Sequence, residues 1–168
     1  MTTVLSLVPT FILIALINFN KKWLLRDLIN MSDKKMFEYI FYSFCISFIG
    51  YSLLTTLSGM VFNLPPPEKH IITPIMYIYS VLFSPIFEEL ICRKLIPRLF
   101  SKYNNITKYL ISSFVFSALH FNLTSFLGYM FLGIIWSHYY KKSNNIFVPI
   151  MSHFLFNYLV ILIQSVKG

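Results

Sequence analysis

Long apolar runs alternate with short polar or basic stretches along the whole chain. A helix needs about 20 predominantly apolar residues to cross the hydrocarbon core of a bilayer, and most of these runs approach or exceed that length. The pattern predicts an all-α protein, a polytopic transmembrane helical bundle of about six helices. The runs cover residues 4–19, 36–64, 71–87, 106–121, 124–140 and 146–166.

Residues at the ends of the runs indicate where helices stop. The first run lacks a basic start and a small-residue cleavage site, which favours a retained helix over a signal peptide. Three consecutive prolines at 65–67 end the second helix, because proline cannot continue one. After the third run, basic and apolar residues interleave over 93–102, as expected for a segment lying in the headgroup plane.

The composition supports a membrane location. Hydrophobic residues make up 57% of the chain and charged residues only 12%, whereas a soluble domain carries about 25% charged residues. The net charge of +8 would suggest nucleic-acid binding in a soluble protein, but here the basic residues lie between apolar runs. We therefore expect the lipid bilayer, and no nucleic acid, as a partner. The two cysteines form neither a disulfide framework nor a metal-ligand spacing.

The basic residues also predict an orientation. Stretches at 20–35, 93–108 and 141–142 hold every Lys and Arg except Lys69 and Lys167. Loops rich in Lys and Arg stay in the cytoplasm, so six helices would place both termini outside. Lys, Ile, Asn and Phe are frequent, which suits an AT-rich bacterial genome. We expect a multi-pass protein of the bacterial cytoplasmic membrane.

Two adjacent glutamates, Glu88 and Glu89, stand at the end of the third run, in a chain with only six acidic residues. A charged side chain inside a bilayer costs about 3 kcal/mol on insertion scales, so it indicates a functional site. Glu89 precedes Arg93 by four residues, which lets the two pair on one helix face. Glu88 is rotated by about 100° from Glu89, and we expect it to face the bundle interior.

Three further polar residues lie within later runs: His120 at the end of the fourth, and His153 and Asn157 in the sixth. The spacing of four places His153 and Asn157 on one helix face. A carboxylate, two imidazoles and an amide suit peptide hydrolysis. The carboxylate takes a proton from water, a histidine holds that water, and the amide and second imidazole donate to the oxyanion. Direct attack by water is favoured, since no Ser or Cys stands in a recognisable nucleophile setting.

At these residues the chain resembles the CPBP family, the CAAX proteases and bacteriocin-processing enzymes, also called the Abi family. The resemblance rests on the order and spacing of three motifs and covers about half of the chain, residues 80–160. The stretch that connects the second motif to the third is similar as well. The motifs read Glu88-Glu89-x-x-x-Arg93, Phe116-x-x-x-His120 and His153-x-x-x-Asn157.

The resemblance implies an intramembrane protease core at residues 71–168, preceded by N-terminal transmembrane helices at 1–70 within a single membrane domain. It also implies residue roles. Glu88 would be the general base, His120 its partner on the catalytic water, His153 and Asn157 the oxyanion site, and Glu89 and Arg93 supporting residues. The chain departs from the family pattern at Lys94 and Ser137, where glycine is usual, and these changes affect helix packing more than chemistry.

The resemblance implies an endopeptidase that acts on peptides or lipid-anchored proteins near the cytoplasmic membrane face, in peptide maturation or bacteriocin self-immunity. A non-catalytic immunity or scaffold protein with the same fold is the alternative. The family is often classed as metalloproteases, and zinc held by Glu88, His120 and His153 is a second alternative. Because the chain has no His-Glu-x-x-His pair and Asn is a poor zinc ligand, we expect that no cofactor is required.

Overall fold

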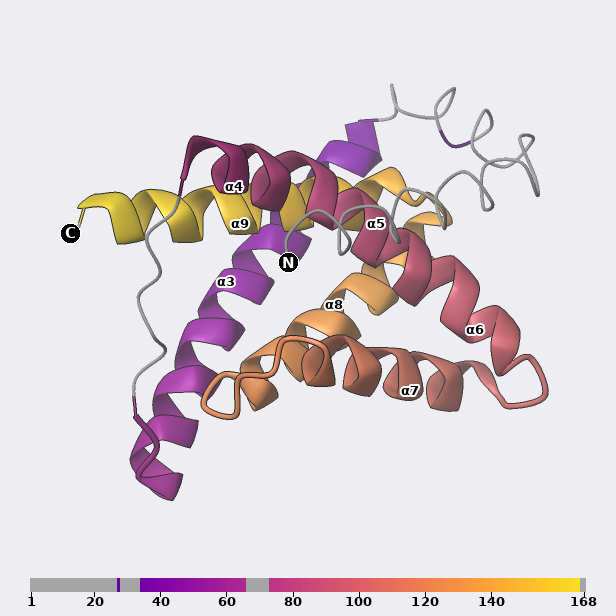
Figure 1. Cartoon of the computed structure of the whole chain (residues 1–168). Coiled ribbons are helices and arrows are strands. Elements are labelled where there is room, and N and C mark those ends of the chain that lie inside the picture. Colours follow the sequence, from indigo (N-terminus) through magenta and orange to yellow (C-terminus); the bar gives the residue numbers. More distant parts are fainter. Residues whose placement is uncertain (1–26, 28–33, 66–72, 167–168) are drawn as a thin grey trace.

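The computed structural model describes residues 27, 34–65 and 73–166 (Figure 1). Every regular element in this part of the chain is a helix, which confirms the all-α prediction. The second to sixth apolar runs each appear as a helical segment, and the first run lies outside the described residues. The long elements are α3 (Lys34–Phe62), a composite helix over Pro74–Leu99, α7 (Asn105–Ala118), α8 (Phe126–Ser143) and α9 (Phe147–Val166).

The composite helix carries the glutamate pair and has an irregular backbone. It begins at Thr73, whose side chain accepts a hydrogen bond from the Met76 N–H group. Two π-helical turns interrupt it, and each is followed by a proline at the start of the next α-helical segment. Its segments are α4 (Pro74–Ile78), η2 (Tyr79–Phe83), α5 (Ser84–Leu90), η3 (Ile91–Leu95) and α6 (Ile96–Leu99).

The prolines explain the π turns. A proline has no N–H group and its ring collides with the carbonyl of the residue four positions earlier. Widening the preceding turn relieves this collision, which fits the positions of Pro85 and Pro97. The helix then continues to Leu99, and Arg93 is 2% exposed. Arg93, at the start of the segment expected in the headgroup plane, is therefore buried within the protein, and the location of 93–102 relative to the membrane stays a prediction.

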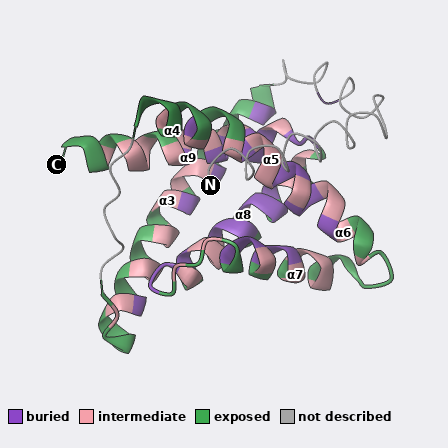
Figure 2. Ribbon diagram, in the orientation of Figure 1, coloured by how far each residue is buried: buried purple, intermediate pink, exposed green. Residues whose placement is uncertain are grey.

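Helix α8 lies at the centre of the described part of the molecule and packs against α3, α7 and α9 (Figure 1). Glycines permit this close packing. A Cβ atom added at Gly133 would lie 2.8 Å from the Cα atom of Ser113 in α7, and one added at Gly128 would lie 2.8 Å from the Tyr51 ring in α3. Figure 2 shows buried residues along α8, while α4 has none.

Within the described residues, three helical segments are long and apolar enough to cross a membrane: α3, Pro74–Leu99 and α9. Most of their residues are not buried inside the protein. Large apolar side chains such as Phe41, Ile49 and Met60 of α3 are exposed, as expected for a surface that faces lipid rather than water. The chain is therefore an integral multi-pass membrane protein.

Candidate active site

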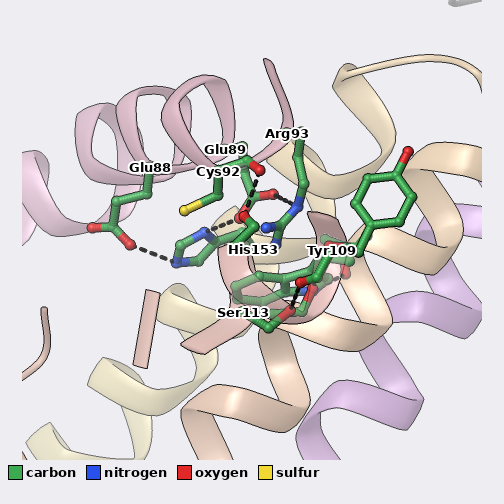
Figure 3. A network of polar contacts seen from close by, with 12 residues as sticks. Glu88, Glu89, Cys92, Arg93, Tyr109, Ser113 and His153 are labelled. Atoms are coloured by element: carbon green, nitrogen blue, oxygen red, sulfur yellow. Dashed lines mark hydrogen bonds and ion pairs between the residues drawn. The ribbon is translucent and has the colours of Figure 1, made fainter. Parts of the chain in front are cut away.

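A series of buried polar groups links the glutamate pair to α9 (Figure 3). Glu89 Oε2 lies 2.9 Å from Arg93 Nε, and neither side chain is exposed. Glu89 Oε1 lies 3.1 Å from Nδ1 of His153, a residue of α9. The ion pair that the four-residue spacing predicts is therefore present, and a histidine from a distant part of the chain extends it.

The contact with Glu89 determines which ring nitrogen of His153 carries a proton. The carboxylate oxygens of an arginine ion pair act as hydrogen-bond acceptors, so Nδ1 of His153 donates. In the neutral ring, Nε2 then keeps its lone pair. Nε2 points toward Glu88, at 3.8 Å from Oε2 (Figure 3). The His153 ring thus stands between the two glutamates, and each nitrogen has a different role.

Glu88 lies at the edge of this cluster. Its side chain is 31% exposed, whereas that of Glu89 is fully buried. The Ser84 hydroxyl, one turn earlier, donates to Glu88 Oε1. Glu88 Oε2 is buried and has no hydrogen-bond partner among the residues that the structure describes. We expected Glu88 to face the interior, but Glu89 takes the more interior position because its partner Arg93 is itself buried.

The separation of 3.8 Å between Glu88 Oε2 and His153 Nε2 is too long for a direct hydrogen bond. Both atoms are acceptors when Glu88 is ionised and His153 is neutral, so the pair requires a donor between them. A water molecule about 2.8 Å from each atom satisfies both. A carboxylate that accepts from such a water can remove its proton, which is the first requirement of hydrolysis by direct water attack.

His120 follows α7 in a turn, and two contacts orient its ring. Nδ1 lies 2.7 Å from the carbonyl oxygen of Phe116, so Nδ1 donates and Nε2 is the acceptor of the neutral ring. The ring stacks on Tyr129 of α8, with centroids 3.8 Å apart. The Phe116 ring contacts both histidines, with centroids 4.7 Å from His120 and 5.9 Å from His153. The structure therefore places His120 near His153.

Asn157 connects α9 to the composite helix. Its Nδ2 donates to the carbonyl oxygen of Ser80 over 2.8 Å. In a π turn that oxygen would accept from the residue five positions later, but this residue is Pro85, which has no N–H group. Asn157 therefore satisfies a carbonyl that the proline leaves without a backbone donor. One amide hydrogen of Asn157 serves this helix contact, and the second is available for another acceptor.

The second π turn repeats this arrangement. Pro97 stands five residues after Cys92 and cannot donate to its carbonyl oxygen. The Ser112 hydroxyl of α7 donates to that oxygen over 2.5 Å, and both residues are buried. The glutamate pair is therefore held between two irregular turns, and a side chain from a different helix supports each turn.

Sequence reasoning missed Ser84 and Ser112 as parts of the site. Ser84 precedes Glu88 by four residues, a spacing that itself predicts contact on one helix face. Ser112 lies 20 residues from its partner and gives no local signal, because hydrogen bonds between helices depend on how the helices pack. The prolines are the only hint, since each marks a carbonyl that needs a donor from elsewhere.

The proposed zinc ligands do not form a ligand set. Among the described residues, no three His, Cys, Asp or Glu side chains are grouped so that they could hold a metal ion. Of the three candidates, Glu88 and His153 approach each other to 3.8 Å. The three side chains are therefore not grouped as a zinc site in the part of the chain that the structure describes.

The fold and the site define a class of protein: a membrane-embedded helical protein in which a buried histidine lies between two glutamates. Residues 70–159 match the sequence profile of the family described as type II CAAX prenyl endopeptidase Rce1-like. The match covers more than half of the chain and includes every candidate site residue. The chain belongs to this family, which confirms the resemblance to the CAAX proteases.

A curated relative comes from Bacillus subtilis (strain 168) and is named "Putative membrane peptidase YdiL". It is 37% identical to the chain over 92 residues. The matched region covers 54% of this chain and 38% of the relative, so the chain spans well under half of the relative's length. No solved structure matches the chain.

Proposed function

We propose that the chain is an intramembrane endopeptidase that hydrolyses a peptide bond near the cytoplasmic membrane face. One observation carries the proposal. Glu88 Oε2 is buried, has no hydrogen-bond partner among the described residues and lies 3.8 Å from Nε2 of His153, while Glu89 holds the other nitrogen of that ring. This arrangement suits activation of a water molecule, and membership of an endopeptidase family supports it.

In the proposed reaction, Glu88 is the general base. It takes one proton from a water molecule, and the water oxygen attacks the carbonyl carbon of the scissile peptide bond. The protonated Glu88 then gives that proton to the leaving amine as the C–N bond breaks, which restores the carboxylate. His120 orients the same water by accepting a hydrogen bond at Nε2, since its Nδ1 is committed to the Phe116 carbonyl.

The proposed oxyanion site consists of His153 and Asn157. For this role the His153 ring carries a proton on both nitrogens, the second taken up from solvent before the reaction begins. Nδ1 then donates to Glu89 and Nε2 donates to the oxyanion. In this form of the ring, Glu88 and His120 hold the attacking water. Arg93 in turn forms an ion pair with Glu89. Asn157 would donate through the amide hydrogen that the Ser80 carbonyl does not use. Removing one oxyanion donor costs about 10²–10³-fold in rate in enzymes of this kind.

The proposed substrates are peptides or lipid-anchored proteins, and the proposed setting is peptide maturation or bacteriocin self-immunity. The name of the Bacillus subtilis relative supports peptidase chemistry and says nothing of the substrate. We propose that the reaction requires no metal. Purified protein that keeps full cleavage in a strong chelator supports this, whereas activity that disappears in chelator and returns with zinc contradicts it.

The experiment that tests the function compares the wild type with Glu88→Gln. Both proteins are purified, reconstituted into liposomes and incubated with a library of membrane peptides, and the products are identified by mass spectrometry. The general base contributes about 10²–10⁴-fold, so cleavage by Glu88→Gln should fall by that amount. The matched control is Glu38→Gln, since Glu38 of α3 is exposed and its loss should leave cleavage unchanged.

Equal cleavage by the wild type and Glu88→Gln would remove the proposed mechanism. The non-catalytic alternative has its own test, in cells that the protein protects from a bacteriocin. Protection that survives Glu88→Ala and His120→Ala together would identify a binding protein instead of a peptidase.

A further inference from the structure

Helix α8 carries none of the motif residues, yet it contacts both histidines of the site. Tyr129 stacks on His120 with ring centroids 3.8 Å apart and planes inclined by 23°. Trp136 stacks on His153 with centroids 4.1 Å apart and planes inclined by 22°. Seven residues separate Tyr129 from Trp136, so both rings lie on one face of the helix. A single helix therefore provides an aromatic surface for each imidazole.

We propose that Tyr129 and Trp136 are positioning residues that hold the rings of His120 and His153 in their reactive orientations. The inference rests on the proposed function. It assigns to α8 a role in the reaction that neither the three motifs nor the hydrogen bonds of the site reveal.

The stacking supplies a restraint that hydrogen bonds at the rings do not. His120 is bonded at Nδ1 to the Phe116 carbonyl, and His153 is bonded at Nδ1 to Glu89. A bond at one nitrogen fixes one point of the ring and leaves a tilting motion about that point. A flat aromatic face within stacking distance opposes the tilt. Each Nε2 then keeps a constant direction, which matters because both atoms act on the same small volume.

Trp136 is itself rigidly held. Its side chain is fully buried. Its Nε1–H group donates to the Ser152 hydroxyl over 3.1 Å, and the Ser152 hydroxyl donates to the Ser43 hydroxyl of α3 over 3.1 Å. The Phe116 ring meets Trp136 edge to face, with centroids 5.7 Å apart. Contacts from α9 and α7 therefore determine where the indole lies, and α3 supports the α9 contact through Ser43.

Tyr129 has comparable support from its neighbours. The ring of Tyr51 in α3 meets it edge to face at 5.3 Å, and Phe116 meets it at 6.3 Å. Gly128 and Gly133 let α8 approach α3 and α7 closely enough for these contacts, as the added-Cβ distances show. The two stacked pairs thus depend on the close packing of α8 with its neighbours.

The first measurement is the kinetics of cleavage, with the library peptide that the wild type cleaves fastest. Tyr129→Leu and Trp136→Leu should each lower kcat about fivefold with KM changed by less than about twofold, because stacking is worth about 1 kcal/mol. Tyr129→Phe and Trp136→Phe keep a flat ring and should recover most of kcat. The matched control is Phe126→Leu, which removes a ring on α8 that pairs with Phe114 and touches neither histidine.

The second measurement does not depend on activity. Protons above an aromatic face are shielded, so the imidazole signals of His120 and His153 should lie upfield in spectra of histidine-labelled protein in detergent. Trp136→Leu should move the His153 signal downfield and leave that of His120, while Tyr129→Leu should do the reverse. Phe126→Leu should move neither signal. If Trp136→Leu does not fold, Trp136→Phe is measured instead. Its His153 signal should show a smaller downfield shift.

Two results would overturn the proposal: histidine signals that stay in place in the Leu variants, or losses of kcat no larger than that of Phe126→Leu. These results differ from a failure of the proposed function. That failure appears as unchanged cleavage by Glu88→Gln, whatever the histidine signals do.

Discussion

Glu88 and Glu89 are neighbours in the sequence, but their surroundings differ. Glu89 is fully buried between Arg93 and His153, while Glu88 bonds Ser84 with one oxygen and leaves the other without a partner among the described residues. One carboxylate therefore orients a histidine, and the other is available to a water molecule. At the scale of single residues, the side of the helix on which a carboxylate lies decides its role.

Arg93→Leu tests whether Arg93 is the buried partner of Glu89. The change leaves the carboxylate of Glu89 buried with no counter-charge from the arginine, and breaking a buried pair from one side costs about 3–5 kcal/mol. We expect the free energy of unfolding, measured by chemical unfolding in detergent micelles, to fall by that amount. Adding Glu89→Gln to Arg93→Leu should recover part of the loss, since the unpaired charge is then removed.

Arg98→Leu is the matched control for Arg93→Leu. Arg98 lies five residues further along the same helix and is exposed, so its replacement should change the free energy of unfolding by less than about 1 kcal/mol. Similar losses in Arg93→Leu and Arg98→Leu would contradict the assignment of Arg93 as a buried partner.

The composite helix Pro74–Leu99 shows how an element can be irregular and still well supported. Pro85 and Pro97 each remove a backbone donor, and the carbonyls of Ser80 and Cys92 accept from α9 and α7 instead. Both turns flank the glutamate pair, so the same contacts that join the helices also fix the rotation of the segment between them. Because α7 and α9 supply the hydrogen-bond donors that the prolines remove, this irregular helix depends on its neighbours.

Ser112→Ala tests whether the second π turn depends on the hydroxyl of Ser112. It removes the only side-chain donor described at the buried Cys92 carbonyl, and an unsatisfied buried acceptor costs about 1–3 kcal/mol. Ser113→Ala is the matched control, because the Ser113 hydroxyl bonds the carbonyl of Tyr109 within its own helix. Chemical unfolding in micelles should show a clearly larger loss for Ser112→Ala, and the opposite order would contradict the assignment.

At the scale of the whole molecule, described basic residues from distant parts of the sequence lie near one another. Lys142, at the end of α8, lies over the ring of Tyr39 near the start of α3, at 5.0 Å from the centroid. Lys94 lies over the ring of Tyr140 at the same distance. The start of α3, the end of α8 and Lys94 therefore lie close together, which agrees with the predicted orientation.

Labelling of single cysteines tests the predicted orientation, in a background of Cys45→Ser and Cys92→Ala. Ser101→Cys, in the basic loop after α6, should react with a membrane-impermeant maleimide only after the cells are opened. Asn63→Cys, at the opposite end of α3, should react in intact cells. Both positions are exposed, so accessibility depends on the side of the membrane. The reverse pattern would invert the topology.

The sequence by itself determined the elements. Apolar runs of membrane-spanning length predicted α3 and α9 to within about two residues of their observed ends, because apolar length is a local property. The spacing of four residues likewise predicted the Glu89–Arg93 pair. The predicted end of the fourth run was less accurate, since α7 stops at Ala118 and His120 lies in the turn that follows.

Only the tertiary structure decided which residues meet across helices. Nothing in the local pattern shows that Glu89 rather than Glu88 lies deepest, or that Ser112 reaches the Cys92 carbonyl. The aromatic surfaces of α8 are also invisible in the sequence, where Trp136 reads as one more apolar residue. The physical reason is that helical periodicity specifies which side chains share a face, while packing specifies what that face touches.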